Sequence, residues 1–276
     1  MFSLAVFREN RRFAIYTALV LLIILIALFG SQLAPQDPFA GYMKHVFSPP
    51  SAAHLFGTDK LGRDTFSRII AGTQVSLFMT ICVVLLMTSL GACIGMLSGY
   101  FGGWIETVLM RFADMMLSFP GIVLAIAIAG ILGGSVVNTI LALFVVGWAK
   151  YARMVRSIVL KIRQEDYITA AKLSGTRTPR ILLRHILPNV LPIVVITGAM
   201  DIGTMMMEIA GLSFLGFGAQ PPTPEWGLML NEGRQYIQTA PWLMVYPGLA
   251  IFLVVAVFNL WGDSLRDVLD PRKADG

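Results

Sequence analysis

The sequence has 276 residues, of which 56% are hydrophobic and only 13% are charged. A soluble domain carries about 25% charged residues, so this composition excludes an ordinary water-soluble protein. The net charge of +5 would suit nucleic-acid binding, but the basic residues do not form one continuous patch, so we expect no nucleic-acid partner. We predict an all-α integral membrane protein whose solvent is mostly lipid.

The first apolar segment follows Arg12 and carries no charge until Asp37. Its run from 13 to 33 matches the roughly 20 residues that cross the hydrocarbon core. A cleavable signal peptide is the alternative, but its apolar region spans about 7 to 15 residues and ends at a small-residue cleavage pattern that this segment lacks. We therefore predict an N-terminal part, 1–73, with a transmembrane helix at about 13–33 and an external loop broken by prolines.

The segment 74–262 is predicted to hold the other five of six transmembrane helices, followed by a charged tail at 263–276. Gly91, Gly95 and Gly99 recur at a four-residue spacing in the second span, which allows a neighbouring helix to approach closely. The predicted spans lie at about 74–99, 104–130, 136–152, 190–217 and 242–262.

Basic residues gather on one side of these six spans. Three Lys or Arg precede the first span, nine lie in 150–184 and three lie in the tail, whereas five fall in the first and third external loops. Because cytoplasmic loops carry the excess of Lys and Arg, we expect both termini and the long loop at about 153–189 to lie in the cytoplasm.

Charged residues inside a span are costly unless they are paired or hydrated, so each is a functional candidate. Arg111 and Asp114 lie three residues apart on one predicted helix, and we expect them to form an intramembrane ion pair. Asp201 and Glu208 lie seven apart on one helical face with Met205 nearby, and we expect all three to line a transport pathway. Packing between helices is the alternative role for the methionine.

Motifs for catalysis are missing from the sequence. It has no G-x-x-x-x-G-K-[ST] phosphate loop, no H-E-x-x-H and no C-x-x-C. His45, His54 and His185 are scattered, so we expect no metal site and no bound cofactor. A secondary transporter with Asp201 and Glu208 as ion sites is one alternative, although six spans without an internal repeat argue against it. An intramembrane enzyme is another, but no nucleophile and base stand out.

The 153–189 segment is polar, yet its composition is typical of helices. Asp166 to Ser174 is predicted to form a compact helix, and Gly175 suits the positive φ of a helix C-terminus. Thr178 and Pro179 fit the N-cap and the first position of a second helix. Such a surface suits docking into a groove on another protein, and an ordinary solvated loop is the alternative.

Several stretches resemble one family of transport proteins. The run from Ala170 to Gly175, followed by 185–188, resembles the cytoplasmic coupling loop of ABC importer permeases, although Thr169 stands where that motif often begins with Glu. Four further stretches together resemble the dipeptide, oligopeptide and nickel permeases over nearly the whole chain: Gly57–Asp64, Leu212–Gly216, Pro222–Gly227 and 258–271.

This resemblance implies a type I importer permease fold in the bacterial inner membrane. It also implies a homologous second permease, two cytoplasmic ATPases that use the ATP, and an external binding protein that delivers cargo. Nickel or a metal chelate is favoured as cargo over di- or oligopeptides because 152–157, 173–175, 201–203 and 233–237 look closer to the nickel branch. The implied ATPase-coupling residues are Asp166, Tyr167, Ala170, Ala171, Leu173 and Gly175.

Overall fold

The structure, a computed structural model, describes residues 10–269. The basic residues Arg8, Arg272 and Lys273, and the end of the last family stretch, lie outside the described residues. The regular elements of the described part are helices: α2 (Arg11–Leu33), α3 (Thr65–Phe101), α4 (Gly103–Leu117), α5 (Gly121–Leu132), α6 (Val136–Ile162), α7 (Asp166–Leu173), α8 (Thr178–Ile181), α9 (Leu187–Phe214), α10 (Trp226–Gly233) and α11 (Trp242–Leu269), with short turns η1 (Met43–His45), η2 (Leu182–Ile186) and η3 (Arg234–Tyr236).

Five helical segments of residues 10–269 are long and apolar enough to cross a membrane: α2, α3, α6, Thr178–Phe214 and α11. The pair α4 and α5 passes the same test together, but its two helices are bent by 88° at their break. Counting the bent pair as one span gives the predicted six. The bend lies at Pro120, which has no N–H to donate and disfavours a helical conformation in the residue before it. The continuous third span that we predicted is therefore two helices.

Helix ends differ from the predicted spans because charged residues can be accommodated on a helix. α3 begins at Thr65 instead of about 74, since the Asp64 carboxylate accepts the backbone N–H of Ser67 at 2.8 Å and so caps the helix. α6 continues to Ile162, ten residues beyond the predicted end of its span, and α11 continues to Leu269.

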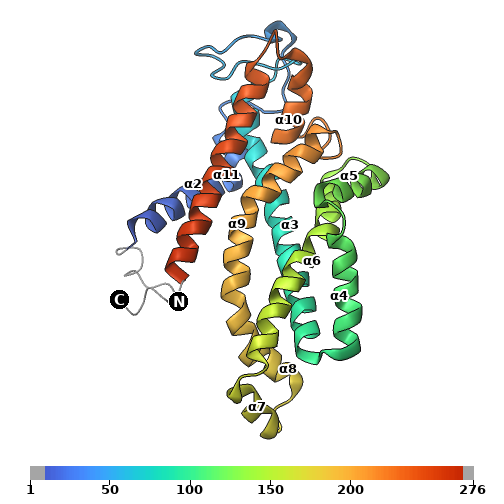
Figure 1. The fold of residues 1–276 in the computed structure, drawn as a ribbon. Helices are drawn as coiled ribbons and strands as arrows, with labels where there is room; N and C mark the ends of the chain where they lie inside the picture. The colour runs from blue at the N-terminus through green and yellow to red at the C-terminus, as the bar shows by residue number, and fades with distance from the viewer. Residues whose placement is uncertain (1–9, 270–276) are drawn as a thin grey trace. The chain divides into compact units, whose positions relative to one another are not determined.

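The chain divides into two compact units. The first comprises 10–82, 128–140 and 200–269 of the described chain, and in it α2 packs beside α11 (Figure 1). Its core joins side chains from five helices: Val20 of α2, Leu77 of α3, Met206 of α9, Trp226 of α10 and Phe258 of α11. Burial of these large apolar side chains holds the unit together.

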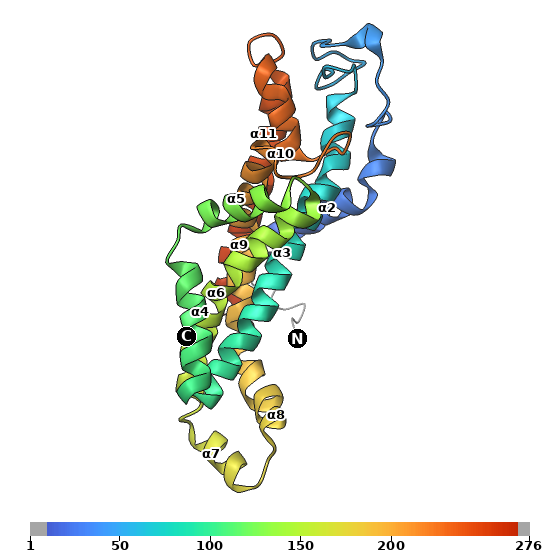
Figure 2. The same ribbon diagram turned by 90° about the vertical axis from the view of Figure 1, so that its right-hand side faces the viewer.

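The second unit comprises 83–127 and 141–199, and Figure 2 shows α7 and α8 at one end of it. Gly91, Gly95 and Gly99 of α3 lie against α6, as the four-residue spacing predicted. A Cβ added to Gly95 would lie 2.6 Å from the carbonyl oxygen of Ala152, so only glycine permits this approach.

Candidate functional site

The segment after α6 contains the helix that we predicted there. α7 spans Asp166–Leu173, and Gly175 follows with a φ of 74°, the left-handed conformation expected at a helix C-terminus. The next helix begins at Thr178 with Arg177 as its N-cap, one residue earlier than predicted, so Pro179 lies at the second helical position. Local signals therefore predicted this segment to within one residue.

α7 is held on its own unit by one buried face. Ile168 is fully buried in a cluster with Val155 and Val159 of α6 and Ile181 at the end of α8. Lys172 adds a cation–π contact, with its Nζ 5.2 Å from the centre of the Tyr100 ring. The opposite face is exposed.

The exposed face of α7 carries most of the residues predicted to couple to an ATPase. Asp166, Ala170 and Leu173 are spaced four and three residues apart and so follow one stripe of the helix. The Leu173 side chain is 85% exposed, and Tyr167 is exposed beside the stripe. Ala171 is half-buried against the core below, so it supports the helix more than it presents a surface. A helix with an exposed leucine on a fixed base suits docking into an apolar groove.

The intramembrane pair predicted between Arg111 and Asp114 is corrected by the structure. Asp114 pairs with Arg153 of α6 instead. Nearby, the Glu106 carboxylate accepts the Nε–H of Arg156 at 2.6 Å. Both pairs join α4 to α6, and they explain why α6 continues as a helix through two arginines.

The predicted pathway residues lie on α9. Asp201 and Met205 are buried, Glu208 is half-buried, and both carboxylates interact with neighbouring groups. The helical register places Asp201 and Glu208 two turns apart. Their predicted role as lining of a transport path remains a prediction.

Residues Gly57 to Asp64 form a tight turn. Gly57 and Gly62 both have positive φ, and the Asp59 carboxylate accepts the backbone N–H of Leu61 at 2.8 Å. The Arg63 Nε lies 2.6 Å from the same carboxylate. These contacts are local and fix the backbone before α3.

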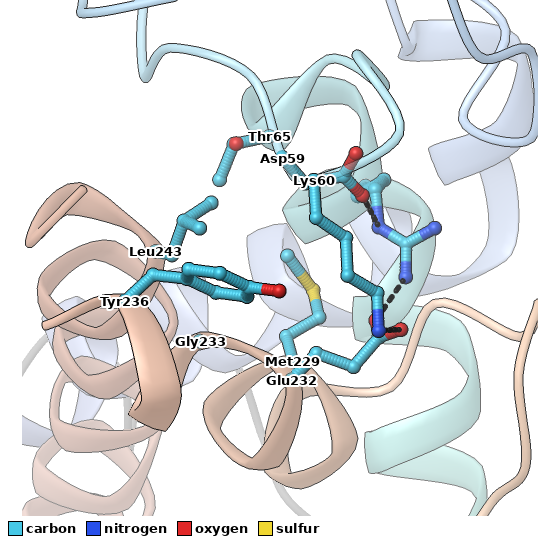
Figure 3. Close-up of a pocket in the computed structure, with 9 residues that line it drawn as sticks. Asp59, Lys60, Thr65, Met229, Glu232, Gly233, Tyr236 and Leu243 are labelled. Carbon is cyan, nitrogen blue, oxygen red and sulfur yellow. Dashed lines mark hydrogen bonds and ion pairs between the residues drawn. The ribbon is translucent and has the colours of Figure 1, made fainter. Parts of the chain in front are cut away.

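Sequence reasoning missed the partner that this turn has on α10. Glu232 accepts contacts from three cations: Lys60 Nζ at 3.4 Å, Arg63 Nη2 at 3.4 Å and Arg68 Nη2 at 3.3 Å. Figure 3 shows Lys60 extending to Glu232 at a pocket that Tyr236 and Leu243 also line. The acidic residue stands within a short helix about 170 residues further along the chain, and nothing in its local pattern indicates this contact.

Glu225 and Trp226 anchor the start of α10 to α3. The Glu225 carboxylate caps α10 by accepting the backbone N–H of Gly227 at 2.9 Å and of Leu228 at 2.8 Å, and the Ser76 hydroxyl of α3 donates to it at 3.3 Å. The buried Trp226 indole donates to the Ile69 carbonyl at 3.0 Å. Burial raises the pKa of the Glu225 carboxyl, and the bonds from Gly227 and Leu228 only partly oppose this.

Glu225→Ala is expected to destabilise the protein by about 1–3 kcal/mol, because two backbone N–H groups and the Ser76 hydroxyl lose their acceptor. The raised pKa means that the folded state binds this proton more tightly than the unfolded state. The contribution of Glu225 to the free energy of unfolding is therefore largest below its ordinary pKa of 4.5. It decreases as the pH rises through the raised pKa. Thermal unfolding of the purified complex should show a wild-type advantage that narrows as the pH rises from 4.5 towards the raised pKa. An advantage that widens over this range would contradict the assignment.

Comparisons with known proteins match both the sequence and the fold. A family model described as "Binding-protein-dependent transport system inner membrane component" matches residues 91–275. The chain is 44% identical to the nickel transport system permease protein NikC of Escherichia coli K12, over 95% of this chain and 96% of that one. It is 42% identical to the dipeptide permease DppC of Alkalihalophilus pseudofirmus, over 96% of this chain and 87% of that one. For the glutathione permease GsiD of Escherichia coli O157:H7, the identity is 43%, over 96% of this chain and 88% of that one.

Solved structures match at lower identity. A chain of the MetNI methionine ABC transporter, in an inward facing conformation, matches with a TM-score of 0.59 at 21% identity, over 74% of this chain and 98% of that one. A chain of an amino acid ABC transporter crystallised with histidines matches with a TM-score of 0.54 at 19% identity, over 75% of this chain and 94% of that one. These likenesses show the fold, which is that of ABC importer permeases.

Proposed function

Because the chain belongs to the family of binding-protein-dependent transport system inner membrane components, we propose that it is one of two permease subunits in an importer for nickel or a nickel chelate. The family places the chain in the inner membrane as a multi-pass, non-catalytic ABC permease without a bound cofactor. Membership also implies ATPase and binding-protein partners. The second permease, the presence of two ATPases and the cytoplasmic position of both termini belong to the proposal, and the excess of basic residues in 150–184 supports that orientation.

In the proposed mechanism, α7 is the contact with an ATPase. Its buried Ile168 makes it move with α6 and α8, and its exposed stripe ends in Leu173. Closure of the ATPases on ATP would draw the two α7 helices of the permease pair together. The membrane helices would then open the path outward, and hydrolysis would let it open inward, which is alternating access.

The cargo proposal is supported by the similarity to the nickel permease and by the chemistry of α9. Asp201 and Glu208 carry carboxylate oxygens on one helical face, and Met205 carries a thioether between them along the helix. Carboxylates attract divalent cations, and sulfur adds a softer contact. The dipeptide and glutathione permeases are similar to almost the same degree. Peptides therefore remain the alternative that an experiment must separate.

Uptake of radioactive nickel should separate these cargoes. Cells that express the complete transporter are expected to take up nickel, and a deletion of this chain alone should abolish that uptake. Excess dipeptide and excess glutathione are added as competitors, and neither should reduce nickel uptake. If nickel uptake survives the deletion while peptide uptake is lost, the cargo is a peptide and the permease role stands. If no uptake changes, the importer role is wrong.

A further inference from the structure

The first external loop is long but fixed. It covers 31 residues between the end of α2 at Leu33 and the start of α3 at Thr65, and within it η1 is a single short turn. Irregular loops of this length inside a compact unit usually serve a function. Thr58 holds the loop: its hydroxyl accepts the backbone N–H of Ser48 at 2.8 Å, and its carbonyl accepts the indole N–H of Trp242 at 3.2 Å.

Glu232 ties this loop to α10. Its carboxylate receives Lys60 and Arg63 from the loop and Arg68 from the first turns of α3. The side chains of Arg63 and Arg68 are fully buried, and Asp59 provides the second carboxylate beside them. Two buried cations require carboxylates in fixed positions, because an unpaired buried charge is strongly unfavourable. The loop, α3 and α10 are therefore locked together at one point.

The locked loop presents apolar side chains to its surroundings. Tyr42 is 57% exposed, Met43 is 76% exposed and Leu61 is 44% exposed. Their two segments lie side by side, since a Cβ added to Gly62 would lie 2.7 Å from the carbonyl carbon of Tyr42. Aromatic and methionine side chains are enriched in protein interfaces, and a surface that is rigid before binding loses less entropy on docking.

We propose that Tyr42, Met43 and Leu61 form a docking surface for the external binding protein, and that Glu232 is the positioning residue that holds this surface in place. The proposal rests on the importer function and on the orientation proposed above, which puts the loop outside the cell. Lys44 is exposed next to Met43, so the matching surface of the binding protein is expected to carry an acidic group at its rim. A rigid surface that combines apolar and charged side chains fits a folded protein partner. Contact with lipid would not require the surface to have a fixed shape.

The test uses the complete transporter in lipid nanodiscs and the purified binding protein of the same system. The double variant Tyr42→Ser, Met43→Ser changes only exposed side chains. It is expected to raise the Kd of the binding protein about tenfold and to leave the basal ATPase rate unchanged. The stimulation of the ATPase by the binding protein should fall at matched concentrations.

Glu232→Gln tests the positioning role: because it removes a carboxylate charge beside two buried arginines, it is expected to lower the thermal stability of the complex and, in the complex that assembles, to raise the same Kd about fivefold. Glu232→Asp should recover part of the affinity because it keeps the charge. Asp37→Asn is the matched control: it is also an acid-to-amide change on this loop, outside the Glu232 cluster, and should leave the Kd within about twofold.

Four outcomes would overturn all or part of the inference. A Kd within about twofold of wild type in the double variant would show that Tyr42 and Met43 do not form a docking surface. A Glu232→Gln variant with unchanged Kd, or with affinity, basal ATPase and assembled complex all reduced together, would reduce Glu232 to a structural role. Weaker retention of the double variant in the membrane at unchanged Kd would assign the patch to lipid. A wild-type ATPase that ignores the binding protein would instead refute the importer function.

Discussion

Replacing Leu173 with aspartate is expected to abolish cargo uptake while the chain remains folded in the membrane. Leu173 is 85% exposed at the end of α7, so the unit loses no internal packing. In the proposed assembly this side chain enters an apolar groove on an ATPase. A carboxylate buried there without a partner would cost several kcal/mol, which is enough to prevent docking. Uptake and co-purification of the ATPases with the chain are the two measurements.

A matched variant shows whether the effect belongs to α7. Leu183 is 63% exposed in η2 of the same unit, so Leu183→Asp makes the identical chemical change outside the stripe. We expect this control to keep its ATPases and most of its uptake. Normal co-purification and normal uptake in Leu173→Asp would show that α7 does not couple in the way proposed.

The segment between α6 and α9 shows why part of the site was predictable. A glycine that requires positive φ at 175 and a proline near the start of a helix at 179 act through their own backbone geometry. Such signals do not depend on distant residues. The bounds of α7 and the start of α8 were therefore predicted to within about one residue, whereas the start of α3 and the end of α6 were missed by about ten.

Long-range pairing was the part that the sequence could not supply. Arg111 stands three residues from Asp114 and was the natural local partner, but the structure gives Asp114 an arginine 39 residues away. Glu232 likewise has its cations in another part of the chain. A charge identifies that a partner is needed, but only the packing of helices determines which partner it meets. The apolar pattern of the sequence predicts the membrane spans, but it does not predict these contacts between charged side chains.

The glycine spacing on α3 leads to the second large expected effect. Gly95→Leu is expected to prevent accumulation of the folded chain. A Cβ at this position would lie 2.6 Å from the Ala152 carbonyl oxygen and 2.7 Å from the Val155 Cβ, both on α6. Backbone atoms cannot move aside as a flexible side chain can, so α3 and α6 would have to separate. Overpacking of a tight core typically costs about 1–3 kcal/mol, and contact with backbone places this variant at the upper end.

The measurement is the amount of monodisperse chain recovered from membranes by size-exclusion chromatography. Gly248→Leu is the control, because it adds the same side chain to a membrane helix where no atom lies within 4 Å of the new Cβ. We expect the control to accumulate like wild type and Gly95→Leu to be lost. Equal recovery of both variants would mean that α3 and α6 can separate at little cost, which would contradict close glycine packing as the contact that holds the second unit together.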